Sequence, residues 1–232
     1  MAIGRIRAAL GAALVVAGAG LGVVGAMASR AADEGALPLP LVLDERLAAP
    51  ASEVTVLAEA LERHLPSDAI VLAWPDVARQ LGVPEDTPTR FDWTAALLAP
   101  RDEGIRLLRE RAGDRPVHLV IHVRDALLLG AAAPERIGVA LQDKADSGNL
   151  HGMINSARDW VLTEGLVAYT AYRLDEGRLR LVGLTDEASL NTLVARLLPF
   201  HDPRRRIEPV PGLTLVHQVG GFWVYRLEPD QG

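Results

Sequence analysis

The stretch Val117-His118-Leu119-Val120-Ile121-His122-Val123 is the strongest β-strand pattern in the chain, and it decides the fold class. Its apolar content is nearly continuous. This is typical of a central strand covered on both faces, whereas a half-exposed strand alternates apolar and polar residues. Arg115-Pro116 precedes the stretch and Asp125 follows it, as expected at the ends of a strand. We therefore expect this strand in the middle of a sheet, with helices packed on either face.

The segments before this strand alternate between helix and strand patterns. Residues 52–65 carry apolar side chains at three- and four-residue spacing, which predicts a helix that Pro66 ends. Residues 68–74 predict a short buried strand followed by a helical turn, and residues 102–111 predict a surface helix. Such alternation is typical of a partly parallel α/β sheet.

The segments after the strand favour antiparallel additions. Apolar and polar residues alternate on both sides of Asp175-Glu176-Gly177 and again around Gly220-Gly221, and each pattern predicts a hairpin. The other predicted elements are a short strand at 137–141, a loop at 143–152, a helix at 153–164 and a single helix at 186–198. We predict an α/β fold with a mixed sheet and helices on both faces, preceded by an N-terminal transmembrane helix.

The N-terminal segment has the pattern of a membrane-targeting sequence. Arg5 and Arg7 precede an uncharged stretch of 22 residues, 8–29, which ends near the small-residue motif Ala26-Met27-Ala28. A secretory signal core has about 7–15 apolar residues, and a membrane-spanning helix needs about 20. The length therefore favours an uncleaved signal anchor, with a cleaved signal peptide as the alternative.

The flanking charges predict how the chain is oriented. Basic residues before an apolar helix favour the cytoplasmic side, which places the C-terminal part outside. We predict a signal anchor or signal peptide at 1–29, a proline-containing tether at 30–50 and a periplasmic α/β domain at 51–232. The membrane contact would be made by residues 8–28, in a single pass through the inner membrane.

Composition excludes several classes of function. The chain has no cysteine, so disulfides, thiolate catalysis, iron–sulfur ligation and covalent c-type haem attachment are excluded. Two of the 24 basic residues lie in the first 28 positions, which contain no acidic residue. The rest of the chain therefore has 22 basic and 30 acidic residues, which gives it a net charge of −8. Such an acidic domain has no electrostatic reason to bind nucleic acid or anionic lipid.

Several polar residues fall at the predicted ends of strands, where α/β proteins usually place their sites. The candidate site residues are Asp76, Arg79, His118, His122, Asp125 and His151. The three histidines and Asp125 are residue types that bind zinc or another divalent metal, but their spacing is no known ligand signature. We therefore predict no metal, and hydrogen-bonded structural histidines are the simpler interpretation.

Two other features have a structural and a functional interpretation. Asp76 can cap a helix that starts at Val77, which we prefer to a role in a site. The run Arg204-Arg205-Arg206 predicts a solvated loop, with a surface for an anionic partner as the alternative. The chain has no Gly-x-Ser-x-Gly elbow, P-loop or GxGxxG motif, so nucleophilic catalysis and nucleotide binding have little support.

Four blocks together resemble the HaoB family, whose members are associated with the octahaem hydroxylamine oxidoreductase of ammonia- and methane-oxidising bacteria. The blocks are Ala69-Ile70-Val71-Leu72-Ala73-Trp74-Pro75-Asp76 with Arg79, His118-Leu119-Val120-Ile121-His122-Val123-Arg124-Asp125, His151-Gly152-Met153-Ile154 and Leu197-Leu198-Pro199-Phe200. The resemblance spans residues 52–228. The family usually has tryptophan where this chain has Pro75. The family has no settled catalytic residues, so the resemblance implies none here.

The resemblance implies an accessory role. We predict a membrane-anchored periplasmic protein associated with hydroxylamine oxidation, without a cofactor, that partners a multihaem hydroxylamine oxidoreductase. Two alternatives stay open. One is a small metal-dependent hydrolase that uses His118, His122, Asp125 and His151, and the other is a ligand-binding sensor domain with an apolar pocket near Trp74 and Trp160.

Overall fold

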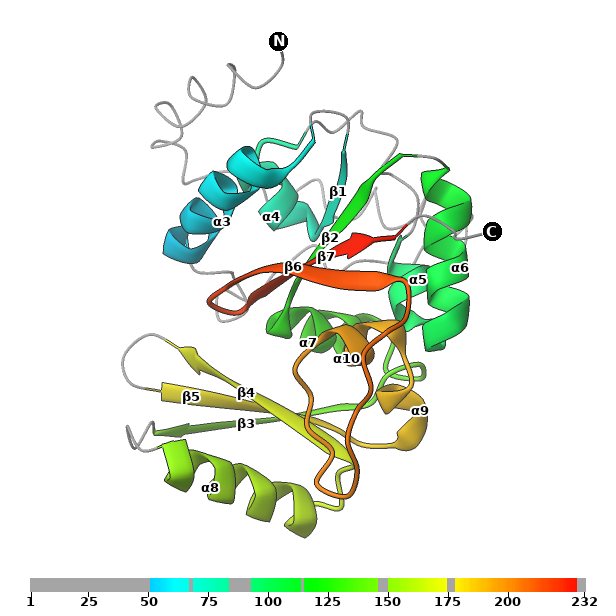
Figure 1. Cartoon of the computed structure of the whole chain (residues 1–232). Helices are drawn as coiled ribbons and strands as arrows, with labels where there is room; N and C mark the ends of the chain where they lie inside the picture. The colour runs from blue at the N-terminus through cyan, green and yellow to red at the C-terminus, as the bar shows by residue number, and fades with distance from the viewer. Residues whose placement is uncertain are drawn as a thin grey trace, which may run out of the picture.

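The computed structural model describes residues 51–66, 69–83, 93–113, 115–145, 150–174 and 178–228, which fold into two sheets with helices around them (Figure 1). The larger sheet has the strand order β1-β2-β7-β6 and the smaller one has the order β3-β5-β4. Their bounds are β1 Ile70–Ala73, β2 Val117–His122, β7 Phe222–Leu227 and β6 Leu213–Val219, then β3 Val139–Ala145, β5 Arg178–Leu184 and β4 Ala168–Leu174.

β2 is a central strand, as its sequence predicts. It pairs in parallel with β1 on one side and antiparallel with β7 on the other, so the sheet is mixed. All six residues of β2 are buried, which explains why the sequence is apolar on both faces rather than alternating. The hairpin predicted around Gly220-Gly221 supplies β6 and β7.

Helices cover both faces of the larger sheet, which confirms that part of the prediction. α3 (Ala51–His64) lies on the face that carries His122, where Glu53 reaches the turn between β6 and β7. α10 (Leu193–Leu197) lies on the opposite face, where the Tyr225 hydroxyl donates to the Leu197 carbonyl at 2.6 Å. α5 (Trp93–Leu98) and α6 (Arg101–Ala112) pack with α10, and α4 (Pro75–Gln80) follows β1.

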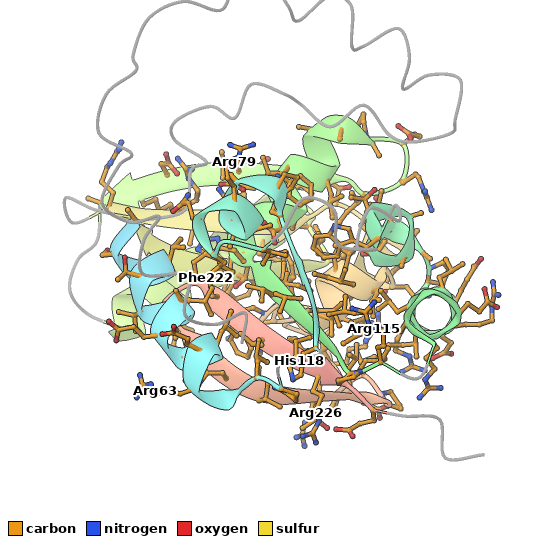
Figure 2. All side chains as sticks on the ribbon, turned by 90° about the horizontal axis from the view of Figure 1, so that it is seen from above. Arg63, Arg79, Arg115, His118, Phe222 and Arg226 are labelled. Atoms are coloured by element: carbon orange, nitrogen blue, oxygen red, sulfur yellow. The ribbon has the colours of Figure 1, made fainter. Side chains whose placement is uncertain are left out.

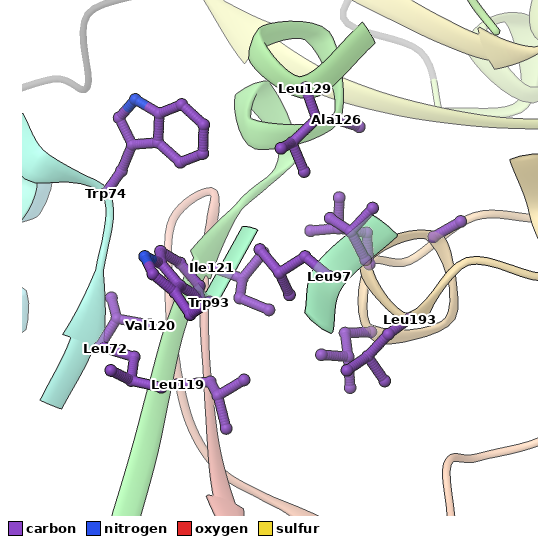
Figure 3. Close-up of a cluster of buried hydrophobic side chains, with 14 of the residues drawn as sticks. Leu72, Trp74, Trp93, Leu97, Leu119, Val120, Ile121, Ala126, Leu129 and Leu193 are labelled. Atoms are coloured by element: carbon purple, nitrogen blue, oxygen red, sulfur yellow. The ribbon is translucent and has the colours of Figure 1, made fainter. Parts of the chain in front are cut away.

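The main hydrophobic core lies between β2 and the helices on the α10 face (Figure 3). Leu119 and Ile121 of β2 belong to one cluster with Leu97 of α5 and Leu193 of α10, and all four are inaccessible to solvent. Burying side chains of this size is worth about 1.5–3 kcal/mol each relative to leaving them exposed. This core therefore holds the central strand against α5 and α10.

The smaller sheet has its own cluster on one face and joins the main core through the other. α8 (Leu150–Thr163) packs Trp160 and Val161 against Leu179 and Leu181 of β5. Gly183 is needed there because a Cβ atom would lie 3.0 Å from the Trp160 ring. On the opposite face, Val139 of β3 meets α7 (Val123–Ala132) at Gly130.

The structure corrects four of the sequence predictions. The hairpin around Asp175-Glu176-Gly177 forms a separate sheet with β3, because alternation marks a strand without specifying its partner. The predicted helix at 186–198 is divided into α9 (Glu187–Leu190) and α10, since the hydroxyl of Thr192 caps a new helix. Residues 143–145 continue β3 and α8 begins at Leu150, so part of the predicted loop at 143–152 is regular structure. α5 and α7 were not predicted.

The predicted anchor at 1–29 and tether at 30–50 lie outside the described residues. No helix within the described ranges is long and apolar enough to cross a membrane.

We predict that Gly104→Ala lowers the free energy of unfolding by about 1–3 kcal/mol. Alanine would stabilise an isolated helix relative to glycine by about 1 kcal/mol. In α6, however, the new Cβ would lie 2.5 Å from the Ala96 carbonyl oxygen and 2.8 Å from Leu193 Cδ2. Urea unfolding followed by circular dichroism measures the change, and a gain in stability would contradict this close packing of α5, α6 and α10.

Candidate functional site

Polar side chains meet where β1 and β2 end. Because the two strands are parallel and adjacent, the helices that follow them, α4 and α7, begin at the same edge of the sheet. This topology brings together a strand-end cluster, which we define as Glu53, Asp76, His122, Arg124 and Asp125.

Arg124 lies at the centre of the strand-end cluster and is completely buried. Its Nη2 atom donates to Asp76 Oδ1 at 2.7 Å, and its Nε atom lies 3.6 Å from Asp125 Oδ1. A guanidinium group stays charged at any pH that a protein tolerates, so a buried one needs carboxylates close by. Asp76 and Asp125 meet this need from two different helices.

His122 and Asp125 form a reciprocal cap at the start of α7. Asp125 Oδ2 accepts from the backbone N–H of His122 at 2.9 Å, and His122 Nδ1 accepts from the backbone N–H of Arg124 at 3.1 Å. This is the arrangement of a capping box, with histidine in the place usually taken by serine or threonine. Because Nδ1 is an acceptor, a neutral His122 carries its proton on Nε2.

Glu53 connects α3 to this cap. Its Oε2 atom lies 3.8 Å from His122 Nε2 and accepts from the backbone N–H of Gly221 at 2.9 Å. The contact with His122 is the largest cause of a lowered pKa for Glu53. Neither Gly220 nor Gly221 has room for a Cβ atom, which would collide with the Glu53 carboxylate in the first case and with the His122 ring in the second.

Burial raises the pKa of Asp125, whereas the pKa of Glu53 is lowered. Removal from water raises the pKa of this carboxyl group to about 6, although the charges of Arg124 and His122 and the hydrogen bond from the His122 backbone lower it. The difference from Glu53 follows from exposure, because the Asp125 side chain is 1% exposed and the Glu53 side chain is 29% exposed.

The other three predicted site residues do not join the strand-end cluster. Arg79 is exposed in the last turn of α4, well away from His118 (Figure 2). His118 is buried opposite Arg226, and burial first and Arg226 second lower its pKa. His151 lies in the first turn of α8, and its side chain is outside the described part.

The geometry gives no support to the metal-dependent alternative. Among the described side chains, no group of three histidine, aspartate, glutamate or cysteine residues is arranged to hold a metal ion. The sensor alternative predicts a shared pocket near Trp74 and Trp160. Trp74 instead packs edge-on against Trp93, 6.4 Å between ring centroids, and Trp160 belongs to the separate cluster beneath α8.

Asp76 does not cap a helix at Val77, so that interpretation is wrong. α4 begins two residues earlier, at Pro75, with Trp74 in the N-cap position and no side-chain cap. Proline is well suited to the first helical position, because its fixed φ is helical and its missing N–H needs no partner there. The Asp76 carboxylate is thus available to Arg124.

Sequence reasoning missed Glu53, Arg124 and the two turn glycines. A signal for Arg124 was present, because the spacing His122-x-x-Asp125 is that of a capping box and the arginine lies inside it. Glu53 had no such signal, since it is 168 residues from the glycine that it contacts. The cluster as a whole joins α3, α4, α7 and the β6–β7 turn, and the Arg124 guanidinium group lies beside the carboxylates of Asp76 and Asp125.

Comparison with known proteins identifies a family that matches the chain. The family model described as HaoA-associated protein HaoB matches residues 26–95 and 84–227, two overlapping parts that cover most of the chain. No curated protein matches the chain, and no solved structure does.

We predict that Arg124→Met lowers the free energy of unfolding by about 3–5 kcal/mol, because it leaves two carboxylates without their buried cation. The matched control is Arg79→Met on the exposed side of α4, which should change stability by no more than about 0.5 kcal/mol. Urea unfolding of both variants measures the difference. Equal effects would show that Arg124 is not the centre of the cluster.

We predict opposite pH dependences for Asp125→Asn and Glu53→Gln. The pKa of Asp125 is about 6 in the folded protein, above the ordinary value of 3.8. As the pH rises, the unfolded chain therefore loses this proton at a lower pH than the folded protein does. This difference lowers the stability of the wild type between about pH 4 and pH 6. Asp125→Asn should therefore gain stability relative to the wild type as the pH rises through this window.

Glu53 has a lowered folded pKa, so its contribution is present above the ordinary value of 4.5 and is lost as the pH falls. Glu53→Gln should lower the stability of the fold most near neutral pH and progressively less as the pH falls below the ordinary pKa of glutamate. Thermal unfolding midpoints measured from about pH 2.5 to pH 7 test both variants, because the window of Glu53 lies below its ordinary pKa. Parallel curves for the two would contradict the assignment.

Proposed function

The chain belongs to the HaoB family of HaoA-associated proteins, and from that premise we propose that it is a membrane-anchored periplasmic accessory protein for hydroxylamine oxidation. Its partner would be HaoA, a multihaem hydroxylamine oxidoreductase. The observation that carries this proposal is the family match, which extends from residue 26 to residue 227 and so includes every described element.

The proposed location rests on the N-terminal sequence. Arg5 and Arg7 precede the apolar stretch at 8–28, and this order favours a cytoplasmic N-terminus with residues 51–232 in the periplasm. The family match begins at residue 26, after almost all of this stretch. The part that resembles the family is therefore the part that we place beside the partner.

The chemistry of the chain supports a binding role rather than a catalytic one. It has no cysteine with which to attach a c-type haem or to form a redox-active thiol. At the strand ends, Arg124, Asp125 and His122 are buried, and the side chains of Asp76 and Glu53 are 14% and 29% exposed. We assign the oxidation chemistry to the partner and recruitment or positioning to this chain.

We predict that the tagged full-length chain recovers HaoA from native membranes. The chain is extracted in mild detergent and captured, and its partners are identified by mass spectrometry and by haem staining. An unrelated single-pass protein with the same tag is the control. Repeated recovery of no multihaem oxidoreductase above this control would overturn the accessory role.

We also predict that residues 1–29 remain on the mature protein as an anchor. The chain should stay in the membrane pellet after an alkaline carbonate wash, and protease added to spheroplasts should digest residues 51–232. Mass spectrometry of the purified N-terminus distinguishes the two kinds of targeting segment. A mature chain that begins at Ser29 would replace the anchor by a cleaved signal peptide.

A further inference from the structure

The segment between α10 and β6 carries three consecutive exposed arginines, Arg204, Arg205 and Arg206. It leaves α10, descends beside the smaller sheet and returns to β6 (Figure 1). Two backbone hydrogen bonds attach it to β4, because the N–H of Tyr169 donates to the His201 carbonyl at 3.0 Å and the N–H of His201 donates to the Tyr169 carbonyl at 2.7 Å.

A buried carboxylate holds this segment in shape. Asp202 is 3% exposed, and its Oδ1 atom accepts from the backbone N–H of Arg204 at 2.8 Å. Its Oδ2 atom pairs with Arg205 Nε at 3.0 Å, and Arg205 also pairs with Glu187 of α9. Residues 200–207 line an open hollow of about 470 Å³. The arginines are therefore presented by a segment with defined internal contacts.

Two further arginines lie next to Arg205. Burial is the largest cause of a lowered pKa for Arg196 of α10, and the charges of Arg101 and Arg205 lower it further, which requires all three cations to be close. The charges of Glu187 and Glu208 raise the pKa of Arg196, but their effect is smaller. The Nε atom of Arg196 is buried and has no hydrogen-bond partner in the described part of the chain.

Three of these five arginines have no ion-pair partner among the residues that the structure describes. Asp102 pairs with Arg101, while Asp202 and Glu187 pair with Arg205. Within the described ranges, no carboxylate lies within 4 Å of Arg196, Arg204 or Arg206. A chain with a net charge of −6 could neutralise these cations at little cost, so their grouping calls for a partner.

We propose that Arg196, Arg204, Arg205 and Arg206, the arginine face, dock a carboxylate-rich surface of the partner protein. This inference rests on the proposed function and names the surface through which the chain would meet HaoA. Arginine suits this role, because its planar guanidinium group binds carboxylates through two parallel hydrogen bonds. The face extends over α10 and the following segment, which fits a protein surface better than a single small anion.

The test uses the full-length chain and purified HaoA, with dissociation constants measured by biolayer interferometry at low and physiological salt. We expect Arg204→Glu/Arg206→Glu to weaken binding about tenfold or more at low salt, because exposed interfacial charges act mainly on association and its salt dependence. Within the described part of the chain, neither side chain has an ion pair to lose. The matched control is Arg63→Glu/Arg115→Glu, which changes the net charge equally at exposed positions on other elements.

The outcomes separate this inference from the proposed function. Loss of binding in the first variant, with the control within about twofold of the wild type, would support the arginine face. If both variants bind as the wild type does, the docking surface is overturned while the proposed function stands. If both are equally weakened, the effect is one of net charge and the face is again overturned. A wild-type chain that does not bind HaoA overturns both.

Two other occupants are tested with the same variants. Size-exclusion chromatography measures self-association, and flotation with phosphatidylglycerol vesicles measures binding of the chain to anionic lipid. If Arg204→Glu/Arg206→Glu abolishes self-association or lipid binding while binding to HaoA is unchanged, the arginine face binds a second copy of the chain or a membrane. The proposal is then wrong. Unchanged far-ultraviolet circular dichroism confirms that the variants are folded.

Discussion

The buried charge of Arg124 determines how the elements at the strand ends must meet. A guanidinium group cannot lose its proton to avoid the cost of leaving water, so carboxylates have to be brought to it. Asp76 arrives from the first turn after β1, and Asp125 arrives from the first turn after β2. Both can reach the same cation because the two strands are parallel neighbours that end at the same edge of the sheet, where Ala73 pairs with Val120, two residues before the end of β2. The ion pairs of Arg124 therefore favour the same alignment of β1 and β2 as the packing of the hydrophobic core does. The two kinds of interaction stabilise one arrangement of the strands.

A second set of contacts extends this constraint to α3, the first described helix. Glu53 reaches His122 and the turn between β6 and β7, and the absence of side chains on Gly220 and Gly221 makes the approach possible. The cluster thus contains two carboxyl groups whose pKa values are shifted in opposite directions, upward by burial for Asp125 and downward mainly by the side-chain hydrogen bond with His122 for Glu53. One polar cluster joins four separate elements, so it contributes to the arrangement of the fold more than to chemistry at its surface.

The sequence predicts the parts of this structure that depend on local patterns. The central position of β2, both hairpins and the first and last long helices follow from periodicity and turn residues. The sequence also places Asp76, His122 and Asp125 at the ends of strands, but it does not establish that these strands are neighbours. The second sheet could not be predicted, because strand partners are chosen by packing over long sequence distances. Glu53 could not be predicted for the same reason, and α7 was hidden because its apolar residues continue those of β2.

The distribution of charge separates what holds the protein together from what it offers to others. Inside, the buried cation of Arg124 has the carboxylates of Asp76 and Asp125 nearby, which is the condition for burying a charge without a large loss of stability. On the surface beside the smaller sheet, Arg196, Arg204 and Arg206 lack ion pairs within the described residues, although the chain has more acidic than basic side chains. Unpaired cations at the surface cost little stability but exert a field on whatever approaches. Groups already paired inside the fold have little interaction left to offer a partner, which is why the docking surface that we propose is the arginine face and not the strand-end cluster.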